Sequence, residues 1–449
     1  MLRALGLSLA LALPAAESLG DAVADAWQRA SEAGVASATA GDLAAAERSF
    51  HEALELAERL PPGDLRRATS ANNYGFVLHA QGRTREALRH YAEALALRDA
   101  TLGPTHPVTA QSLNNLAEAL RSEGQREEAE RLHRRAIEIR RTRLAPNHPD
   151  LAESLNNLGV LLTDERRFDE AEALFAEALE IRTKALGERH VAVAEVLGNL
   201  GALGFARGDL ALAEERQRSA VAIIDSVRGR DDPERAVALG NLAQVLAAAG
   251  KSDEAVAVLE EALDIRLRRL GAERLETAQS RHALALALMR RNELDRAREQ
   301  LVASLATREH VLGLQSPELT PVLADLAEVE RQRGEYDAAL ASLRRAVAID
   351  EANLGPDDPR LAIGLNNLAV LLGEQGDWAA AEPFLARALA IEERTLGRDD
   401  PELIVTLESH AAVLERLDRR EEAAAARNRA AAIRLASAAR GTEPAAGPP

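Results

Sequence analysis

Asparagine is the residue whose type and spacing in this chain most suggest recognition chemistry. Pairs of adjacent asparagines recur at steps of 42 residues, and two further copies keep only the second asparagine. A carboxamide both donates and accepts hydrogen bonds, as the backbone of an extended peptide requires. The candidate peptide-binding residues are Asn72, Asn73, Asn114, Asn115, Asn156, Asn157, Asn199, Asn241, Asn366 and Asn367.

Two roles are open for these asparagines. Asparagine is a poor residue in the middle of a helix, so its recurrence needs a reason. The first role is a ladder of amides that binds a partner peptide, and the alternative is that the second asparagine of each pair hydrogen-bonds the neighbouring unit. For the first asparagine we favour the groove, because its position varies as a ligand-facing position does, to Gly198, Gly240, His282 and Ala324.

Other motifs that could do chemistry give no site. Histidines recur once per unit, at His106, His148 and His190, but the same position elsewhere holds aspartate or serine, mostly just before a proline. That pattern predicts a helix N-cap rather than a metal ligand. Gly250 and Lys251 end like a phosphate-binding loop, but the first glycine of that motif is missing. We therefore predict no catalytic residues, no bound metal and no cofactor.

The elements that carry the asparagines are predicted from columns of small residues. One column is alanine at every step of 42 from Ala87 to Ala423. Within residues 155–187, two apolar stripes with helical spacing are separated by a turn, a position at which most copies carry glycine. Each unit is therefore a helical hairpin, which can bury both of its helices only by stacking on its neighbours.

The unit resembles the tetratricopeptide repeat in the order of Leu155, Asn157, Leu158, Gly159, Leu162, Ala171, Phe175 and Ala178. The opening LNNL and the connector of Leu102, Gly103, His106 and Pro107 resemble the 42-residue repeats of kinesin light chains. The resemblance spans roughly residues 21–437. It implies an all-α, right-handed superhelical solenoid of about ten helix–turn–helix hairpins, and proteins that this chain resembles bind peptides on the concave face.

The domain organisation follows from where the repeat holds. Residues 1–16 have the form of a signal peptide, with Arg3 followed by an apolar run of about ten residues. The solenoid is expected over 21–437, with a cap hairpin at 21–60, regular repeats at 67–397 and a second cap hairpin at 402–437. Residues 438–449 are expected to be a disordered tail. The signal predicts a periplasmic or secreted protein; the alternative is an uncleaved capping helix in a cytoplasmic one.

Composition narrows the possible partners. The formal net charge of −17 opposes binding of nucleic acid, and the N-terminal apolar run is too short to span a membrane. The function expected is a non-catalytic scaffold that binds a partner protein or extended peptide on the concave face. The alternative is a structural protein that oligomerises, or supports an envelope complex, through its end hairpins.

Overall fold

The computed structural model describes residues 21–441, which contain twenty α-helices, one short 3-10 helix and no β-strand. These residues form two compact units, residues 21–230 (unit 1) and residues 231–441 (unit 2). The predicted signal segment, residues 1–16, and residues 442–449 of the predicted tail lie outside the described residues. The prediction of an all-α fold built from about ten hairpins is confirmed.

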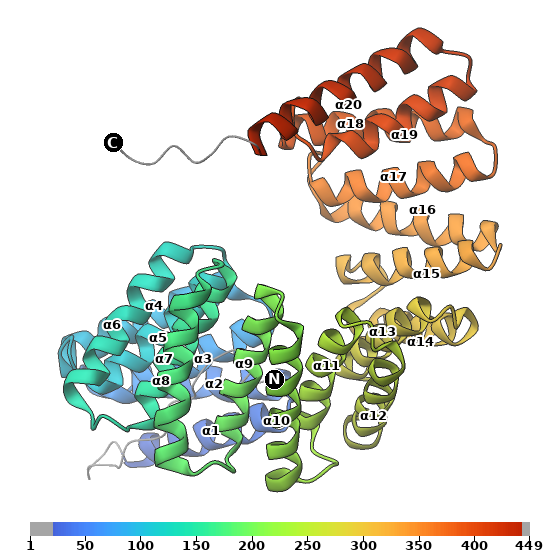
Figure 1. Ribbon diagram of the computed structural model, residues 1–449. Helices are drawn as coiled ribbons and strands as arrows, with labels where there is room; N and C mark the ends of the chain where they lie inside the picture. The colour runs from blue at the N-terminus through green and yellow to red at the C-terminus, as the bar shows by residue number, and fades with distance from the viewer. Residues whose placement is uncertain (1–20, 442–449) are drawn as a thin grey trace. The chain divides into compact units, whose positions relative to one another are not determined.

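Each unit consists of five hairpins, in which an odd-numbered first helix packs against the even-numbered second helix that follows it (Figure 1). The helices of unit 1 are α1 (Asp21–Thr39), α2 (Leu43–Glu58), α3 (Leu65–Ala80), α4 (Thr84–Leu102), α5 (Pro107–Ser122), α6 (Arg126–Arg143), α7 (Pro149–Asp164), α8 (Phe168–Leu186), α9 (Val191–Arg207) and α10 (Leu210–Arg228). Those of unit 2 are α11 (Pro233–Ala248), α12 (Ser252–Leu270), α13 (Leu275–Arg290), α14 (Leu294–Leu312), η1 (Pro317–Leu319), α15 (Thr320–Gln332), α16 (Tyr336–Asn353), α17 (Pro359–Glu374), α18 (Trp378–Thr395), α19 (Leu403–Arg416) and α20 (Arg420–Gly441).

Neighbouring hairpins pack mainly through the second helix of one and the first helix of the next, and adjacent first helices also touch. In unit 1, α3 contacts α5, α5 contacts α7, and α7 contacts α9; in unit 2, α11 contacts α13, α13 contacts α15, and α17 contacts α19. The asparagine columns lie on these first helices. We call the face of the first helices that carries these columns the ladder face.

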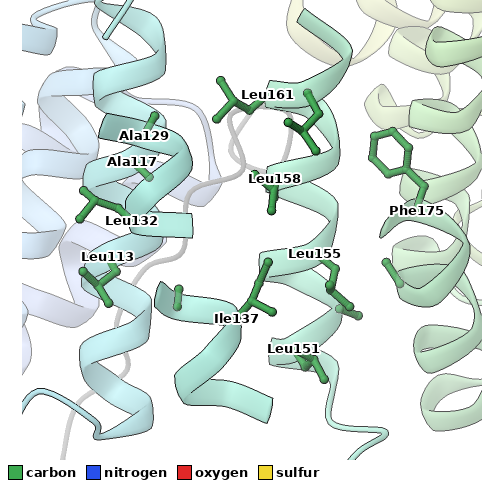
Figure 2. Packing of buried hydrophobic residues seen from close by; sticks show 14 of the residues in the cluster. Leu113, Ala117, Ala129, Leu132, Ile137, Leu151, Leu155, Leu158, Leu161 and Phe175 are labelled. Carbon is green, nitrogen blue, oxygen red and sulfur yellow. The ribbon is translucent and has the colours of Figure 1, made fainter. Parts of the chain in front are cut away.

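Small residues of the first helix let the second helix approach closely. A Cβ added to Gly159 of α7 would lie 2.6 Å from the ring of Phe175 on α8, and one added to Gly34 would lie 2.5 Å from Phe50. Figure 2 shows Phe175 beside α7, whose leucines Leu155 and Leu158 are buried in the same cluster. The periodic small residues therefore set the distance between paired helices, as the sequence predicts.

The turn inside each hairpin is also as predicted. The glycines at this position have positive φ, for example +81° at Gly82 and +82° at Gly376. Three copies lack the glycine and still adopt positive φ, at Arg166 (61°), Asn292 (60°) and Asp418 (62°). A non-glycine residue in this region is strained, and arginine more than asparagine or aspartate.

The N-cap prediction for the histidine column is confirmed. The Nδ1 atoms of His106, His148 and His190 accept hydrogen bonds from the backbone amide two residues further on, at 3.2, 3.2 and 3.1 Å. Asp232 and Asp358 cap their helices in the same way. Each histidine thus begins a helix.

The last helix is longer than the repeat predicts. α20 continues to Gly441, so residues 438–441, assigned by the sequence to a disordered tail, are helical. The segment before the helix end is rich in alanine, the best helix former, and this explains the extension.

Candidate functional site

The structure places the predicted asparagines in two different environments. Six of them, all in unit 1, are at most 2% exposed: Asn72, Asn73, Asn114, Asn115, Asn156 and Asn157. Asn199 is partly buried, and so is Asn366 of unit 2. Asn241 and Asn367, also in unit 2, are exposed. Among the candidate asparagines, Asn241 and Asn367 of unit 2 are therefore the most accessible to a partner.

In unit 1 the two asparagine columns are joined across neighbouring hairpins. Asn115 Nδ2 donates to Asn72 Oδ1 at 2.9 Å, and Asn199 Nδ2 donates to Asn156 Oδ1 at 2.8 Å. In both cases the second asparagine of one hairpin bonds the first asparagine of the hairpin before it. This is the stacking contact that the sequence left open for the second asparagine, and it fixes the orientation of the amides.

Other hydrogen bonds of the first asparagines cross between hairpins or link the two helices of one hairpin. Asn114 Nδ2 donates to Ser154 Oγ at 2.8 Å, and Asn156 Nδ2 donates to Glu195 Oε1 at 3.2 Å. The Oδ1 atom of Asn114 lies 3.1 Å from Nδ1 of His133 on the second helix of the same hairpin. The amides therefore belong to a buried polar network, so their loss would leave other polar groups without partners.

One pair of neighbouring hairpins in unit 2 keeps the same connection with different residues. His282 and Asp325 occupy the positions of the first and second asparagine, and His282 Nε2 lies 2.5 Å from Asp325 Oδ2. The copy that lacks asparagine is thus still joined to its neighbour on the ladder face.

Charged triads flank the amides at equivalent positions in the two units. In unit 1, Arg121 bonds Glu118 of its own helix at 2.5 Å and Asp164 of the next first helix at 2.7 Å. In unit 2, Arg331 makes the same pair of contacts, with Glu328 at 2.8 Å and Glu374 at 3.1 Å.

The environments of the two triads differ in electrostatics. Burial raises the pKa of Glu118, although the charge of Arg121 and its hydrogen bond oppose the rise. The hydrogen bond from Arg331 lowers the pKa of the more exposed Glu328. At this position, the acidic side chain of the ladder face is thus more buried in unit 1 than in unit 2.

The ladder face of unit 2 also carries exposed aliphatic side chains. Ile363 and Val370 lie on α17, three residues before and four residues after Asn366, and are 61% and 41% exposed. Val405, in the column of Ile363 on α19, is 64% exposed. We call these three residues the aliphatic strip. Exposed branched side chains grouped on one face are a typical feature of contact surfaces.

The sequence interpretation missed a column of buried arginines near the ends of the second helices. Each donates from Nη1 to the backbone oxygen ten residues further on, at or just before the start of the next first helix, as in Arg98 to Val108 at 3.2 Å and Arg182 to Ala192 at 2.7 Å. The column was visible in the sequence as arginine at steps of 42, interrupted by Ile224. We call its members the arginine staples: Arg98, Arg140, Arg182, Arg266 and Arg308.

These arrangements hold neighbouring hairpins together. Within residues 21–441, His, Asp and Glu side chains form no group of three that could hold a metal ion. None of the helices in that range combines the length and the apolar character needed to cross a bilayer.

Solved structures similar to this chain include repeat proteins of several kinds. BtubC from P. vanneervenii is 28% identical, with 51% of this chain and 92% of that chain covered and a TM-score of 0.43. Nearly identical kinesin light chain TPR-like repeats from Podosopora anserina are 26% identical, with 46% and 96% covered and a TM-score of 0.41. A Rap protein complexed with competence and sporulation factor is 17% identical, with 75% and 88% covered and a TM-score of 0.54. No protein with a curated description matches.

A match to a family profile shows which family of proteins the chain belongs to. The profile described as Tetratricopeptide repeat matches residues 29–100, 66–142, 150–226, 202–268, 234–310, 275–352, 318–391 and 360–436. These overlapping segments cover nearly all the described hairpins of both units. The predicted resemblance to the tetratricopeptide repeat is confirmed. The chain belongs to the tetratricopeptide repeat family.

Proposed function

We propose that this protein is a non-catalytic scaffold that binds a partner protein or an extended peptide through its ladder face. Tetratricopeptide repeats support protein–protein interaction in general, and the chain carries them along nearly its whole described length. The observation that carries the proposal is the exposure of Asn367 together with the aliphatic strip on α17 and α19. An exposed amide among exposed branched side chains offers both backbone hydrogen bonds and apolar contact to a partner.

The two groups of asparagines have different parts in this proposal. The exposed amides of Asn241 and Asn367 contact the partner directly. The buried pairs, such as Asn72 with Asn115, hold adjacent first helices in register, so that the ladder face keeps a fixed shape. A surface fixed before binding loses less conformational entropy when the partner docks.

Site-specific photo-cross-linking in the native cell tests this function. A photoreactive amino acid is placed at Ile363 or Asn367 on the ladder face, and at Val302 on the second helix α14 as the control. Val302 is 43% exposed, comparable to Val370 of the strip. We expect the two ladder-face positions to capture the same partner and the control to capture little of it. Equal capture at all three positions, or capture only at Val302, would contradict the proposal.

A binding measurement with the captured partner then separates the two parts. Asn367→Ala should weaken binding and leave thermal unfolding unchanged, because this exposed side chain is not part of the buried network of unit 1. The matched control is Asn428→Ala, an exposed asparagine on the second helix α20. A loss of binding in the control equal to that of Asn367→Ala would place the contact elsewhere.

A further inference from the structure

The sequence column that contains the arginine staples changes from arginine to acidic residues within unit 2. After Arg308 the column continues with Asp350 and Glu392. Arg98 donates to Ser112, fourteen residues further on, at 2.8 Å. At Glu392 the equivalent contact is kept with donor and acceptor exchanged, because Thr406 Oγ1 donates to Glu392 Oε1 at 2.9 Å.

The second oxygen of this carboxyl group has no such partner. Glu392 Oε2 is buried and makes no hydrogen bond. In the staple Arg98, Nη1 donates both to this hydroxyl position and to the backbone oxygen ten residues further on. Counted from Glu392, the backbone oxygen belongs to Glu402, which precedes α19. An ionised carboxylate can only accept hydrogen bonds, whereas a neutral carboxyl group carries one O–H donor. Only the protonated form can therefore make the bond that the staples make.

The charges around Glu392 favour the neutral form. Burial raises the pKa of Glu392, and the nearby negative charge of Glu402 raises it further, against the hydrogen bond from Thr406. Three ion pairs on the packed helices and their connectors balance further charges. They are Glu393 of α18 with Arg429 of α20, Arg394 of α18 with Asp357, and Glu408 of α19 with Arg434 of α20.

We propose that Glu392 is a protonation-dependent latch that holds the last hairpin, α19 and α20, on the hairpin before it. The neutral carboxyl group bridges α18 to the start of α19 as an arginine staple does at other junctions. Ionisation removes the donor, leaves a charged oxygen buried without a partner, and loosens the last hairpin. Because the carboxyl pKa is raised on folding, this stabilisation is complete below the pKa of an ordinary glutamate and is lost as the pH rises through the raised value.

Native-state hydrogen exchange of the full chain, corrected for intrinsic exchange rates, tests the latch. The amides of α19 are compared at pH 5 and pH 8 in the unmodified protein and in Glu392→Gln. We expect the opening constant of α19 to increase with pH in the unmodified protein, by up to about tenfold for each unit between the folded and unfolded pKa. The glutamine variant, which keeps a neutral donor, should be equally protected at both values.

Two further variants keep the test decisive. Glu392→Arg restores the staple residue of the column and should also remove the pH dependence. Glu393→Gln alters the neighbouring, ion-paired glutamate and should leave the pH dependence in place. The proposal is overturned if the unmodified protein shows no pH dependence at α19, or if Glu392→Gln and Glu392→Arg retain it in full.

Discussion

Replacing Gly159 with alanine is the sharpest test of the close packing inside each hairpin. The new Cβ would lie 2.6, 2.9 and 2.9 Å from three ring atoms of Phe175, closer than real Cβ contacts come. The ring is only 1% exposed and cannot swing into solvent. Overpacking of this kind costs about 1–3 kcal/mol, and the gain in helix propensity from glycine to alanine returns about 1 kcal/mol. We expect net destabilisation of about 1 kcal/mol.

Gly198 provides the matched control in the same unit. It also lies inside a first helix, α9, but a Cβ there would meet its nearest atom, Gln217 Oε1, at 3.9 Å. Gly198→Ala should therefore stabilise the chain by about 1 kcal/mol. Urea unfolding of both variants measures the difference through the midpoint at unchanged slope. If Gly159→Ala is as stable as Gly198→Ala, the close approach does not control the hairpin.

The chain itself suggests a rescue for the damaged hairpin. In four of the six copies with alanine at the small position, as at Ala243 and Ala285, the residue sixteen positions later is leucine, here Leu259 and Leu301. Adding Phe175→Leu to Gly159→Ala should therefore recover part of the lost stability, with a favourable coupling energy in the double-mutant cycle. Additive losses would show that these two side chains do not press on each other.

Three other predictions concern the turns, the ladder and pH. Arg166→Gly should raise stability by about 1 kcal/mol in urea unfolding, because the residue has a φ of 61°; an unchanged midpoint would argue against strain there. Asn199→Ala should cost about 1–3 kcal/mol by depriving the buried Oδ1 of Asn156 of its donor, whereas Asn367→Ala should change the free energy of unfolding by less than about 0.5 kcal/mol. Burial lowers the pKa of His133 to about 3, so protonation favours the unfolded chain and stability should fall as the pH drops below about 6.5, by about 3 kcal/mol at pH 4.5. His133→Gln should reduce that loss, and an identical pH profile for the two proteins would exclude His133 as its source.

The sequence predicted the hairpin architecture because each local signal repeats in register. The glycine turns, the N-caps such as His106 and the small column facing Phe175 all depend on interactions within one hairpin or its own connector. Such interactions are set by residues close in sequence, and their spacing can therefore be recognised from the sequence alone.

The site was less predictable because it depends on how hairpins stack. Helical geometry shows that Asn115 points away from the core of its own hairpin, but not that its amide meets Asn72 of the preceding one. The same limit hid the staples, since Arg98 looks like a surface charge until the next helix covers it. The division after Arg230 lies within a connector of regular length, so the spacing of the repeats does not mark it.

Side-chain footprinting of the purified complex with the cross-linked partner tests the central claim most directly. Hydroxyl-radical labelling is compared between free and bound protein at the aliphatic strip, Ile363, Val370 and Val405, and at Val302 and Val311 on the second helix α14. The proposed scaffold function predicts strong protection of the strip and unchanged labelling on α14. Protection of α14 with a fully labelled strip would contradict it.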